Sequence, residues 1–427
     1  MNYDESIIVG LDIGTTKVCA IIGMVNEYGS IDVLGVGVSP SKGLRKGVVV
    51  NIESTVHSVA TAIEKAELMA GIEVKSVYAG IAGGHIEGIN SRGVVAVSGK
   101  NREISREDVE RVIDAAKAIA IPMEREVIHV FPQEFIVDNQ DGIKDPIGMS
   151  GVRLEAEVHI VTGAVASAQN IVKSVNRAGY AVNDIVLEPL ASALSTLKDD
   201  EKELGVVLLD IGGGTTDVLV YLNGSIWHTS VIALGGNHIT NDISIGLRTP
   251  VQTAEEIKKK WGVAVSDLVD PEEAIEVPSV GGRKPNVMPR QILAEIIQPR
   301  IEEIFFLVKE NLDRLEFKDI ISGGIVLTGG TSRLVGVERV AEKVFEMPVR
   351  VGRPQGVGGL VDEVASPEFA TGVGLLLYGM NARPESFMEN RGPGLFSNIK
   401  KRMVDWLGEF FYGMKKTGQP KKLKLDF

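Results

Sequence analysis

The chain has 427 residues, 44% hydrophobic and 24% charged, which is enough for two or three domains with ordinary cores. Its net charge of −12 argues against nucleic acid as a partner of the whole chain, and its single cysteine, Cys19, within an apolar run, indicates a buried thiol in a reducing compartment rather than a disulfide or a metal site. Asp4 and Glu5 precede the first apolar run and no apolar stretch reaches the ~20 residues of a spanning helix, so neither a signal peptide nor a transmembrane helix is expected.

The hydrophobic pattern predicts an α/β protein. Strand patterns lie at 76–82, 93–98, 126–137, 157–162, 184–187, 225–232 and 324–328. Helical patterns lie at 52–70, 106–120, 165–178, 188–197, 253–261, 291–315, 333–345 and 367–379. Residues 83–164 contain several strands and one helix, and they look like a subdomain inserted into the first half of the chain.

One motif occurs twice. Residues 11–18 read LDIGTTKV and residues 209–218 read LDIGGGTTDV, and each copy follows an apolar run and leads into another. Each therefore predicts a strand, a tight glycine turn and a second strand, which together make a β-hairpin. Two halves that open with related hairpins predict a bilobed fold with a cleft between the lobes.

The two turns have the composition of a phosphate-binding site. Glycines let backbone N–H groups approach a β- or γ-phosphate, and threonine hydroxyls add donors. The candidate phosphate contacts are Gly14, Thr15, Thr16, Lys17, Gly212, Gly213, Gly214, Thr215 and Thr216. Asp12 and Asp210 are the candidates to hold Mg²⁺ through its waters, because Mg²⁺ dehydrates reluctantly. One glycine turn alone is equally an ordinary hairpin turn, but the duplication favours the phosphate site.

A third glycine cluster follows the strand pattern at 324–328. Gly329, Gly330 and Ser332 lead into a helix that contains Leu334 and Val337, and a turn of this kind is a candidate to lie against a base or ribose. By itself the cluster is weak evidence, because a strand followed by two glycines and a helix is common.

The segment 395–411 predicts a basic amphipathic helix. At 100° per residue its apolar residues form one stripe, with two basic residues at the stripe's edges. The candidate membrane contacts are Phe396, Ile399, Lys400, Arg402, Met403, Trp406, Leu407, Phe410 and Phe411. From Leu395 onward there are eight Lys/Arg and three Asp/Glu, a net charge of +5 that leaves −17 in the preceding residues. A flexible linker at 380–394 and a lysine-rich end favour a helix that lies on an anionic membrane, although such helices more often pack on protein.

Together the hairpins and the Val-Leu-Thr-Gly-Gly segment resemble the actin, Hsp70 and sugar-kinase superfamily, from about Ile7 to Gly379. In that superfamily two connecting helices line the hinge, and residues 188–193 and 369–374 are similar to them. Residues 254–258 (AEEIK) match a helix of bacterial actin-like proteins that faces the nucleoside, so the resemblance implies that Glu255 and Lys258 contact ribose or adenine. A solvated charged face is the alternative for this helix.

The inserted region narrows the resemblance. Residues 145–159 (DPIGMSGVRLEAEVH), 125–129 and 104–108 resemble the SHS2-type insert of the FtsA family of bacterial actin-like cell-division proteins. The resemblance implies a bilobed actin-like ATPase fold with these parts: a first lobe (1–82, 165–196 and 358–379), the SHS2-type insert (83–164), a second lobe (197–244 and 313–357), an upper subdomain (245–312), the linker (380–394), the membrane-targeting helix (395–411) and a basic tail (412–427).

For function, the resemblance implies ATP and Mg²⁺ binding, self-assembly into actin-like filaments, and binding of the C-terminal peptide of FtsZ by the upper subdomain, with Arg300 as the candidate peptide contact. It also implies a position on the cytoplasmic side of the cell membrane at the septum, where the terminal helix tethers the Z ring and later division proteins are recruited. Hydrolysis needs a group that orients water. Glu188 is the candidate, with a helix-capping carboxylate as its alternative, and ATP turnover is left open.

Three alternatives share parts of this pattern. A metabolic kinase of the superfamily would need a catalytic base and a substrate site, for which the sequence offers no clear residues. A pilus-assembly relative of FtsA has the body and an insert but no need of an amphipathic anchor. An MreB-like filament protein lacks the insert at 83–164.

Overall fold

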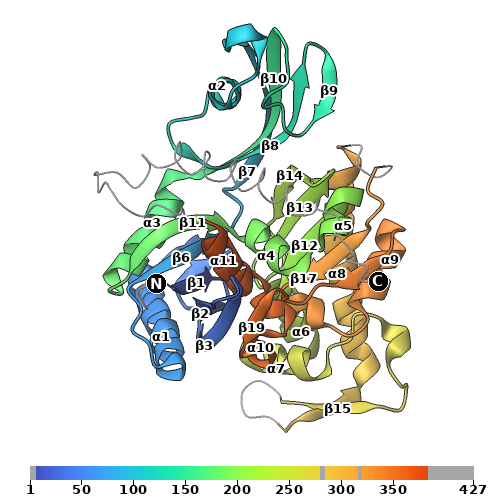
Figure 1. Ribbon diagram of the computed structural model, residues 1–427. Helices are drawn as coiled ribbons and strands as arrows, with labels where there is room; N and C mark the ends of the chain where they lie inside the picture. The colour runs from blue at the N-terminus through green and yellow to red at the C-terminus, as the bar shows by residue number, and fades with distance from the viewer. Residues whose placement is uncertain (1–5, 279–283, 316–319, 383–427) are drawn as a thin grey trace, which may run out of the picture. The chain divides into compact units, whose positions relative to one another are not determined.

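The computed structural model describes residues 6–278, 284–315 and 320–382 (Figure 1). The described residues form two compact units, the first from 6–89, Ile121–Phe131 and the described part of His159–Leu377, and the second from Asn90–Ala120, Pro132–Val158 and 378–382. The amphipathic segment 395–411 and the basic tail lie outside the described residues. None of the helices in the described ranges is long and apolar enough to cross a membrane.

The first unit contains a six-stranded sheet in the order β11-β6-β1-β2-β3-β19. Its strands are β1 (Ile7–Ile13), β2 (Lys17–Val25), β3 (Ile31–Pro40), β6 (Ser76–Ile81), β11 (Ala181–Leu187) and β19 (Val357–Gly359). Helix α1 (Ile52–Ala70) lies so close to β3 that a Cβ on Gly37 would be 1.9 Å from the carbonyl oxygen of Ala62. Helix α11 (Ala370–Asn381) approaches β1 at Gly10 in the same way, so glycines on the strands allow close helix–sheet packing.

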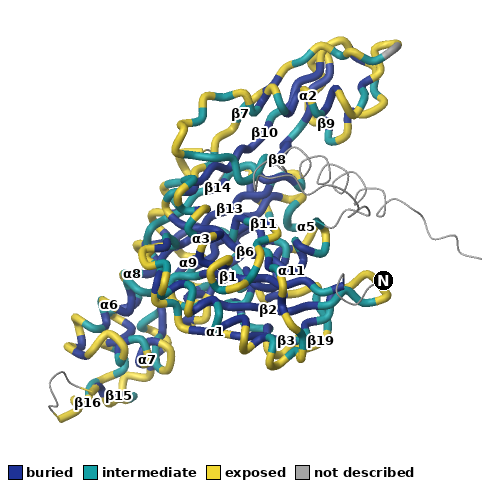
Figure 2. The backbone as a smooth tube through the Cα atoms, turned by 90° about the vertical axis from the view of Figure 1, so that its left-hand side faces the viewer, coloured by how far each residue is buried: buried dark blue, intermediate teal, exposed yellow. Residues whose placement is uncertain are grey.

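The same unit contains a five-stranded sheet in the order β14-β13-β12-β17-β18. Its strands are β12 (Val206–Ile211), β13 (Thr216–Leu222), β14 (Ser225–Ile232), β17 (Ile325–Thr328) and β18 (Val349–Val351). Val207, Leu209 and Ile211 belong to a fully buried core that also includes apolar residues of the helices α6 (Gly236–Leu247), α8 (Arg290–Asp313) and α9 (Val337–Phe345). Figure 2 shows the central strands β1 and β13 mostly buried. Such continuous apolar strands are typical of a sheet covered on both faces.

Further elements complete the first unit. They are β4 (Leu44–Arg45), β5 (Val48–Val49), α3 (Val165–Arg177), α4 (Glu188–Thr196), α5 (Asp199–Leu204), α7 (Val251–Trp261), η3 (Ser266–Leu268), β15 (Ala274–Val277), β16 (Asn286–Pro289), η5 (Gly330–Arg333), α10 (Val361–Val364) and η6 (Pro367–Phe369).

A four-stranded sheet has the order β7-β10-β8-β9, and the second unit contains β9 together with residues 90–96 of β7, 132–137 of β8 and 153–158 of β10. The strands are β7 (Glu87–Ala96), β8 (Arg125–Val137), β9 (Gln140–Ile143) and β10 (Arg153–Ala164), and the unit also holds the turn η2 (Lys100–Arg102) and helix α2 (Arg106–Lys117). A capping box starts α2: Ser105 and Asp108 each accept a hydrogen bond from the other's backbone N–H. A Cβ on Gly93 would be 2.2 Å from the carbonyl oxygen of Val112, so α2 packs directly on β7.

Most predicted elements are confirmed, with shifted ends. The strand predicted at 93–98 is longer and earlier (Glu87–Ala96), and the helix predicted to contain Leu334 begins only at Val337, because residues 330–333 form a 3-10 turn first. The expectation of a buried thiol is confirmed, since Cys19 is fully buried and free.

Candidate functional site

The first repeat forms the predicted hairpin. Strands β1 and β2 pair antiparallel, with Ile13 opposite Val18 and Asp12 opposite Cys19. Four residues, 14–17, make the turn, and the N–H of Gly14 donates to the carbonyl oxygen of Lys17 at 3.0 Å.

The second repeat forms a hairpin with the same turn. Ile211 lies opposite Thr216 and Asp210 opposite Asp217, and residues 212–215 make the turn. The N–H of Gly212 donates to the carbonyl oxygen of Thr215 at 3.0 Å, as Gly14 does in the first hairpin. The structural equivalents of Thr15 and Thr16 are therefore Gly213 and Gly214, two positions earlier than the Thr-Thr match of the sequences indicates.

The two turns face each other. A Cβ on Gly213 would lie 2.3 Å from Cγ2 of Thr16, and a Cβ on Gly214 would lie 2.6 Å from Oγ1 of Thr15. The glycines of the second turn thus leave the space that the threonines of the first turn fill. The second pair of threonines is turned inward: the hydroxyl of Thr216 donates to the carbonyl oxygen of Leu234 at 3.0 Å, and that of Thr215 to Asp217 at 3.3 Å.

Three buried aspartates, Asp12, Asp210 and Asp217, lie on the hairpin strands next to the two facing turns. The pKa of Asp12 is raised to about 6, mainly by burial, with Lys17 lowering it and Asp210 raising it further. Burial and the nearby Asp210 raise the pKa of Asp217 to about 8. The pKa of Asp210 is also raised by burial, against the lowering effect of its hydrogen bonds and of Lys17. Negative charge therefore exceeds positive charge at this place.

Glu188, the half-buried first residue of α4, adds a fourth carboxyl group. Its pKa is raised well above the usual value, first by burial and then by the three aspartates. Helix α4 has no side-chain cap hydrogen bond at its start. A Cβ on Gly80 would lie 3.0 Å from Oε1 of Glu188, so this end of β6 makes room for the carboxylate.

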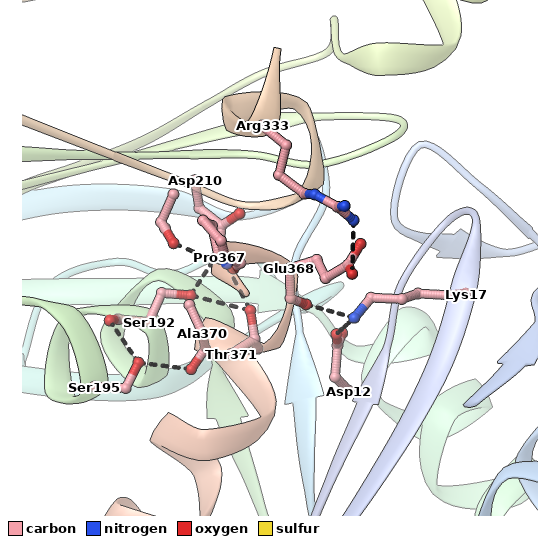
Figure 3. A network of polar contacts seen from close by, with 11 residues as sticks. Asp12, Lys17, Ser192, Ser195, Asp210, Arg333, Pro367, Glu368, Ala370 and Thr371 are labelled. Carbon is pink, nitrogen blue, oxygen red and sulfur yellow. Dashed lines mark hydrogen bonds and ion pairs between the residues drawn. The ribbon is translucent and has the colours of Figure 1, made fainter. Parts of the chain in front are cut away.

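Lys17, which lies beside the aspartates, is already engaged (Figure 3). Nζ of Lys17 lies 3.9 Å from Oδ2 of Asp12, donates to the carbonyl oxygen of Glu368, and sits 4.6 Å from the centre of the Phe369 ring. The carboxylate of Glu368 pairs with Arg333 at 2.9 Å. The segment 367–369 therefore connects the first hairpin with the turn at 330–333.

That turn is joined to the second hairpin. Oγ1 of Thr331 donates to the carbonyl oxygen of Gly212 at 3.1 Å. Gly329 has φ +84, and a Cβ there would lie 2.4 Å from Oδ1 of Asp210, so only glycine fits beside the aspartate. The hydroxyl of Ser332 donates back to the carbonyl oxygen of Gly329 at 2.7 Å.

Glu255 and Lys258, the predicted nucleoside contacts, lie on α7 next to the same hairpin. Nζ of the buried Lys258 donates to the carbonyl oxygen of Gly236 at 3.0 Å and to Thr240 at 2.8 Å, and it pairs with Glu255 at 2.6 Å. Because Gly236 is itself bonded to Gly212, this network attaches α7 to the second turn.

The donor set suits a magnesium–nucleotide complex. Oδ1 of Asp217 is buried without a hydrogen-bond partner in the described structure, and Lys17 balances only part of the charge of the clustered carboxylates. Within the described ranges no three Asp, Glu, His or Cys side chains are grouped to hold a metal ion by themselves. A magnesium ion here would need water and phosphate oxygens among its ligands.

Arg300, the predicted peptide contact, lies on α8 and is paired with neighbouring carboxylates. Its Nε and Nη2 donate to the two carboxylate oxygens of Asp242 on α6, at 2.6 and 3.0 Å, and Glu303 pairs with its remaining nitrogen. The predicted membrane contacts at 396–411 lie outside the described residues.

Comparison with known proteins decides the family. The family model described as "Cell division protein FtsA" matches residues 207–374, and the model described as "SHS2 domain inserted in FTSA" matches residues 83–162. A "Cell division protein FtsA" of Pseudomonas aeruginosa is 53% identical over 94% of this chain and 97% of its own length. That of Escherichia coli K12 is 43% identical over 96% of this chain and 99% of its own. The chain belongs to the FtsA family.

Solved structures confirm the actin-like fold of this FtsA-family chain. A "PilM-PilN type IV pilus biogenesis complex" matches with a TM-score of 0.63 at 16% identity, over 87% of this chain and 98% of the other. MreB5 of Spiroplasma citri, solved bound to ADP, matches with a TM-score of 0.54 at 15% identity, over 87% and 95%. At such identities the likeness concerns the fold alone.

Sequence reasoning missed three residues of this FtsA-family site. Asp217 was overlooked because matching the two Thr-Thr pairs aligns it with Lys17 in the sequence. In the structure, Asp217 on β13 pairs with Asp210 on β12 across the hairpin. Ser192 and Thr371, which donate to Asp210, were predicted only as parts of the segments 188–193 and 369–374 that resemble the hinge helices. No spacing rule links these two, since they lie 179 residues apart.

Proposed function

We propose that this cell-division protein binds ATP with Mg²⁺ where the two hairpin turns face each other. The observation that carries the proposal is the gathering of Asp12, Asp210, Asp217 and Glu188 around one engaged lysine. Burying like charges is unfavourable unless a cation balances them. A magnesium ion bound with the nucleotide would supply that charge.

The chain's own residues have distinct roles in this proposal. Asp12 and Asp210 would hold the magnesium ion through its waters, and backbone N–H groups of the two turns, 14–17 and 212–215, would bind the phosphates. Glu255 and Lys258 contact the ribose or base, with the turn at 329–332 beside them. Glu188 orients a water for slow hydrolysis, a role that requires its ionised form and therefore a lowering of its pKa on cation binding.

Calorimetric titration of the full chain with ATP, with and without Mg²⁺, tests the proposal. We expect tight binding that depends on Mg²⁺ and is lost in an Asp12→Asn/Asp210→Asn double variant. Asp267→Asn, at an exposed position, is the matched control and should bind normally. Absence of binding to the wild-type chain under both conditions would contradict the proposal.

The same proposal includes FtsZ. The C-terminal peptide of FtsZ docks on the upper subdomain (245–312), and Arg300 exchanges its bond to Asp242 for a peptide carboxylate. Arg300→Ala should lower peptide affinity, measured by fluorescence anisotropy, by about 10-fold, as expected for loss of a charge-assisted pair. Arg314→Ala, at the end of the same helix and paired with Glu310, is the control. Equal affinity of wild type and Arg300→Ala would remove Arg300 from the peptide site.

Membrane tethering is assigned to residues 395–427. Their removal should abolish flotation with anionic vesicles while ATP binding persists, and Trp406→Glu should weaken flotation more than Asp405→Ala. Flotation of the truncated chain would refute the tether.

On the membrane the chain self-associates into actin-like filaments, tethers the Z ring and recruits later division proteins. Electron microscopy on lipid monolayers should show filaments with the full chain.

A further inference from the structure

The crossing of helices α4 and α11 reaches into the aspartate cluster (Figure 3). A Cβ on Gly374 would lie 1.7 Å from the carbonyl oxygen of Ala191, so the two backbones are in direct contact. Close contact brings two hydroxyls together: Oγ of Ser192 on α4 and Oγ1 of Thr371 on α11 are 3.0 Å apart, and both residues are buried.

Both hydroxyls converge on one oxygen of Asp210. Oδ2 accepts from Ser192 at 2.5 Å and from Thr371 at 3.2 Å. The other oxygen, Oδ1, faces the space left by the missing side chain of Gly329. One side of the carboxylate is therefore fixed by two helices, and the other side is kept clear by a glycine.

Ser195, one turn further along α4, makes a contrasting contact. Its hydroxyl donates to the carbonyl oxygens of Ala370 at 2.7 Å and of Ser192 at 3.1 Å. It ties the same helices together without touching Asp210. The crossing is thus held by one hydroxyl that serves the helices alone and two that also hold the aspartate.

We propose that Ser192 and Thr371 are positioning residues, which hold Oδ2 of Asp210 so that Oδ1 is presented to the hydrated magnesium ion of the nucleotide. The proposal rests on the ATP–Mg²⁺ site described above. An ion held at Oδ1 needs the orientation of Asp210 that these two contacts fix. The ion therefore favours the intact crossing, and by reciprocity an intact crossing strengthens metal binding.

The test measures how tightly the full chain binds a fluorescent ATP analogue as Mg²⁺ is added. The quantity compared is the Mg²⁺ concentration at which half of the maximal gain in affinity is reached. Ser192→Ala and Thr371→Val should raise this concentration by about 10-fold, the effect usual for a group that orients a metal-site residue. Affinity in EDTA should not change, because the two hydroxyls act only through Asp210. Thr371→Ser keeps the hydroxyl and should behave as wild type.

Ser195→Ala is the matched control. It removes a hydroxyl from the same crossing, so any general loosening of the helices will appear as a lower melting temperature without a change in Mg²⁺ dependence. Unchanged Mg²⁺ dependence in both Ser192→Ala and Thr371→Val, or an equal loss in EDTA, would overturn the inference while the nucleotide site stands. A wild-type chain that binds no nucleotide would instead refute the proposed function, and this inference with it.

Discussion

The hairpins β1–β2 and β12–β13 share one turn geometry but surround their aspartates differently. In the first, Asp12 lies opposite the neutral Cys19 and 3.9 Å from Lys17. In the second, Asp210 lies opposite another carboxylate, Asp217, and its partners are two hydroxyls rather than a cation. The comparison teaches that two copies of a motif can keep the same backbone turn while the charged and polar groups around their aspartates differ.

The unequal charge assigns different roles to the two copies. Because the first hairpin carries its own cation, Asp12 is partly balanced before any ligand arrives. The second hairpin buries two carboxylates together, and the pKa of Asp217 rises to about 8 as a result. We therefore expect the second hairpin to depend more strongly on an added cation than the first.

The largest predicted difference concerns the aspartates themselves. Asp210→Asn should weaken Mg²⁺-dependent ATP binding by about 100-fold and Asp12→Asn by about 10-fold, within the range seen when groups around a metal are removed. Calorimetry in Mg²⁺ and in EDTA separates the metal-dependent part. A larger loss for Asp12→Asn would reverse the ranking of the two hairpins.

The contact between the turns gives the next effect. Gly213→Ala places a methyl group 2.3 Å from Cγ2 of Thr16, and it should lower the free energy of unfolding by about 1–3 kcal/mol, as overpacking does. Gly212→Ala meets only the carbonyl oxygen of Thr215, at 3.4 Å, and should be nearly neutral. Chemical denaturation measures both. Adding Thr16→Ala to Gly213→Ala should restore part of the loss, and a Gly212→Ala variant that is equally destabilised would contradict the facing arrangement.

The two hairpins should also differ in how they contribute to the pH dependence of the free energy of unfolding. Without Mg²⁺, folding raises the pKa of Asp217 from 3.8 to about 8, so the folded state keeps a proton that the unfolded state loses. This contribution is fully present below about pH 4 and falls as pH rises toward 8, by at most about 1.4 kcal/mol per pH unit. Asp217→Asn should remove this slope in urea unfolding, whereas Cys19→Ser at the equivalent position should leave it. An unchanged slope in Asp217→Asn would place the proton elsewhere.

The smallest effect is expected at Lys17. Its side chain is partly exposed and 3.9 Å from Asp12, so Lys17→Met should cost less than about 1 kcal/mol of ATP binding, or under about 5-fold in affinity. The variant should also raise the pKa of Asp12 above its present value of about 6. A loss as great as that of Asp210→Asn would show that Lys17 contacts phosphate directly.

The sequence predicted those parts of the site whose signals are local. Both hairpins follow from apolar runs around glycine, and α1 matches its predicted range, 52–70, since Asn51 caps its start and Gly71 its end. Strand β3 and helix α6 were not predicted. Helix α6 starts at Gly235-Gly236 and contains Thr240 and Ser244, residues that seldom favour a helix, and tertiary packing decides its structure.

The parts of the site that could not be predicted depend on contacts between residues far apart in the sequence. The meeting of Ser192 and Thr371 requires the contact of two helices, and the facing of Thr16 with Gly213 requires the two lobes to approach. The position of Asp217 beside Asp210 requires the strand register, which a gapped sequence match obscured. Predictions for 395–411 lie outside the described residues and stay predictions.

Cys19, the residue opposite Asp12, has a practical consequence. The chain holds one cysteine, it is fully buried, and burial raises the pKa of its thiol to about 12. Such a thiol is nearly inert toward maleimide and iodoacetamide at neutral pH. A cysteine introduced at Tyr28, which is 93% exposed, would therefore carry the reactive thiol of the molecule, and fluorophores could be attached there without altering the hairpin.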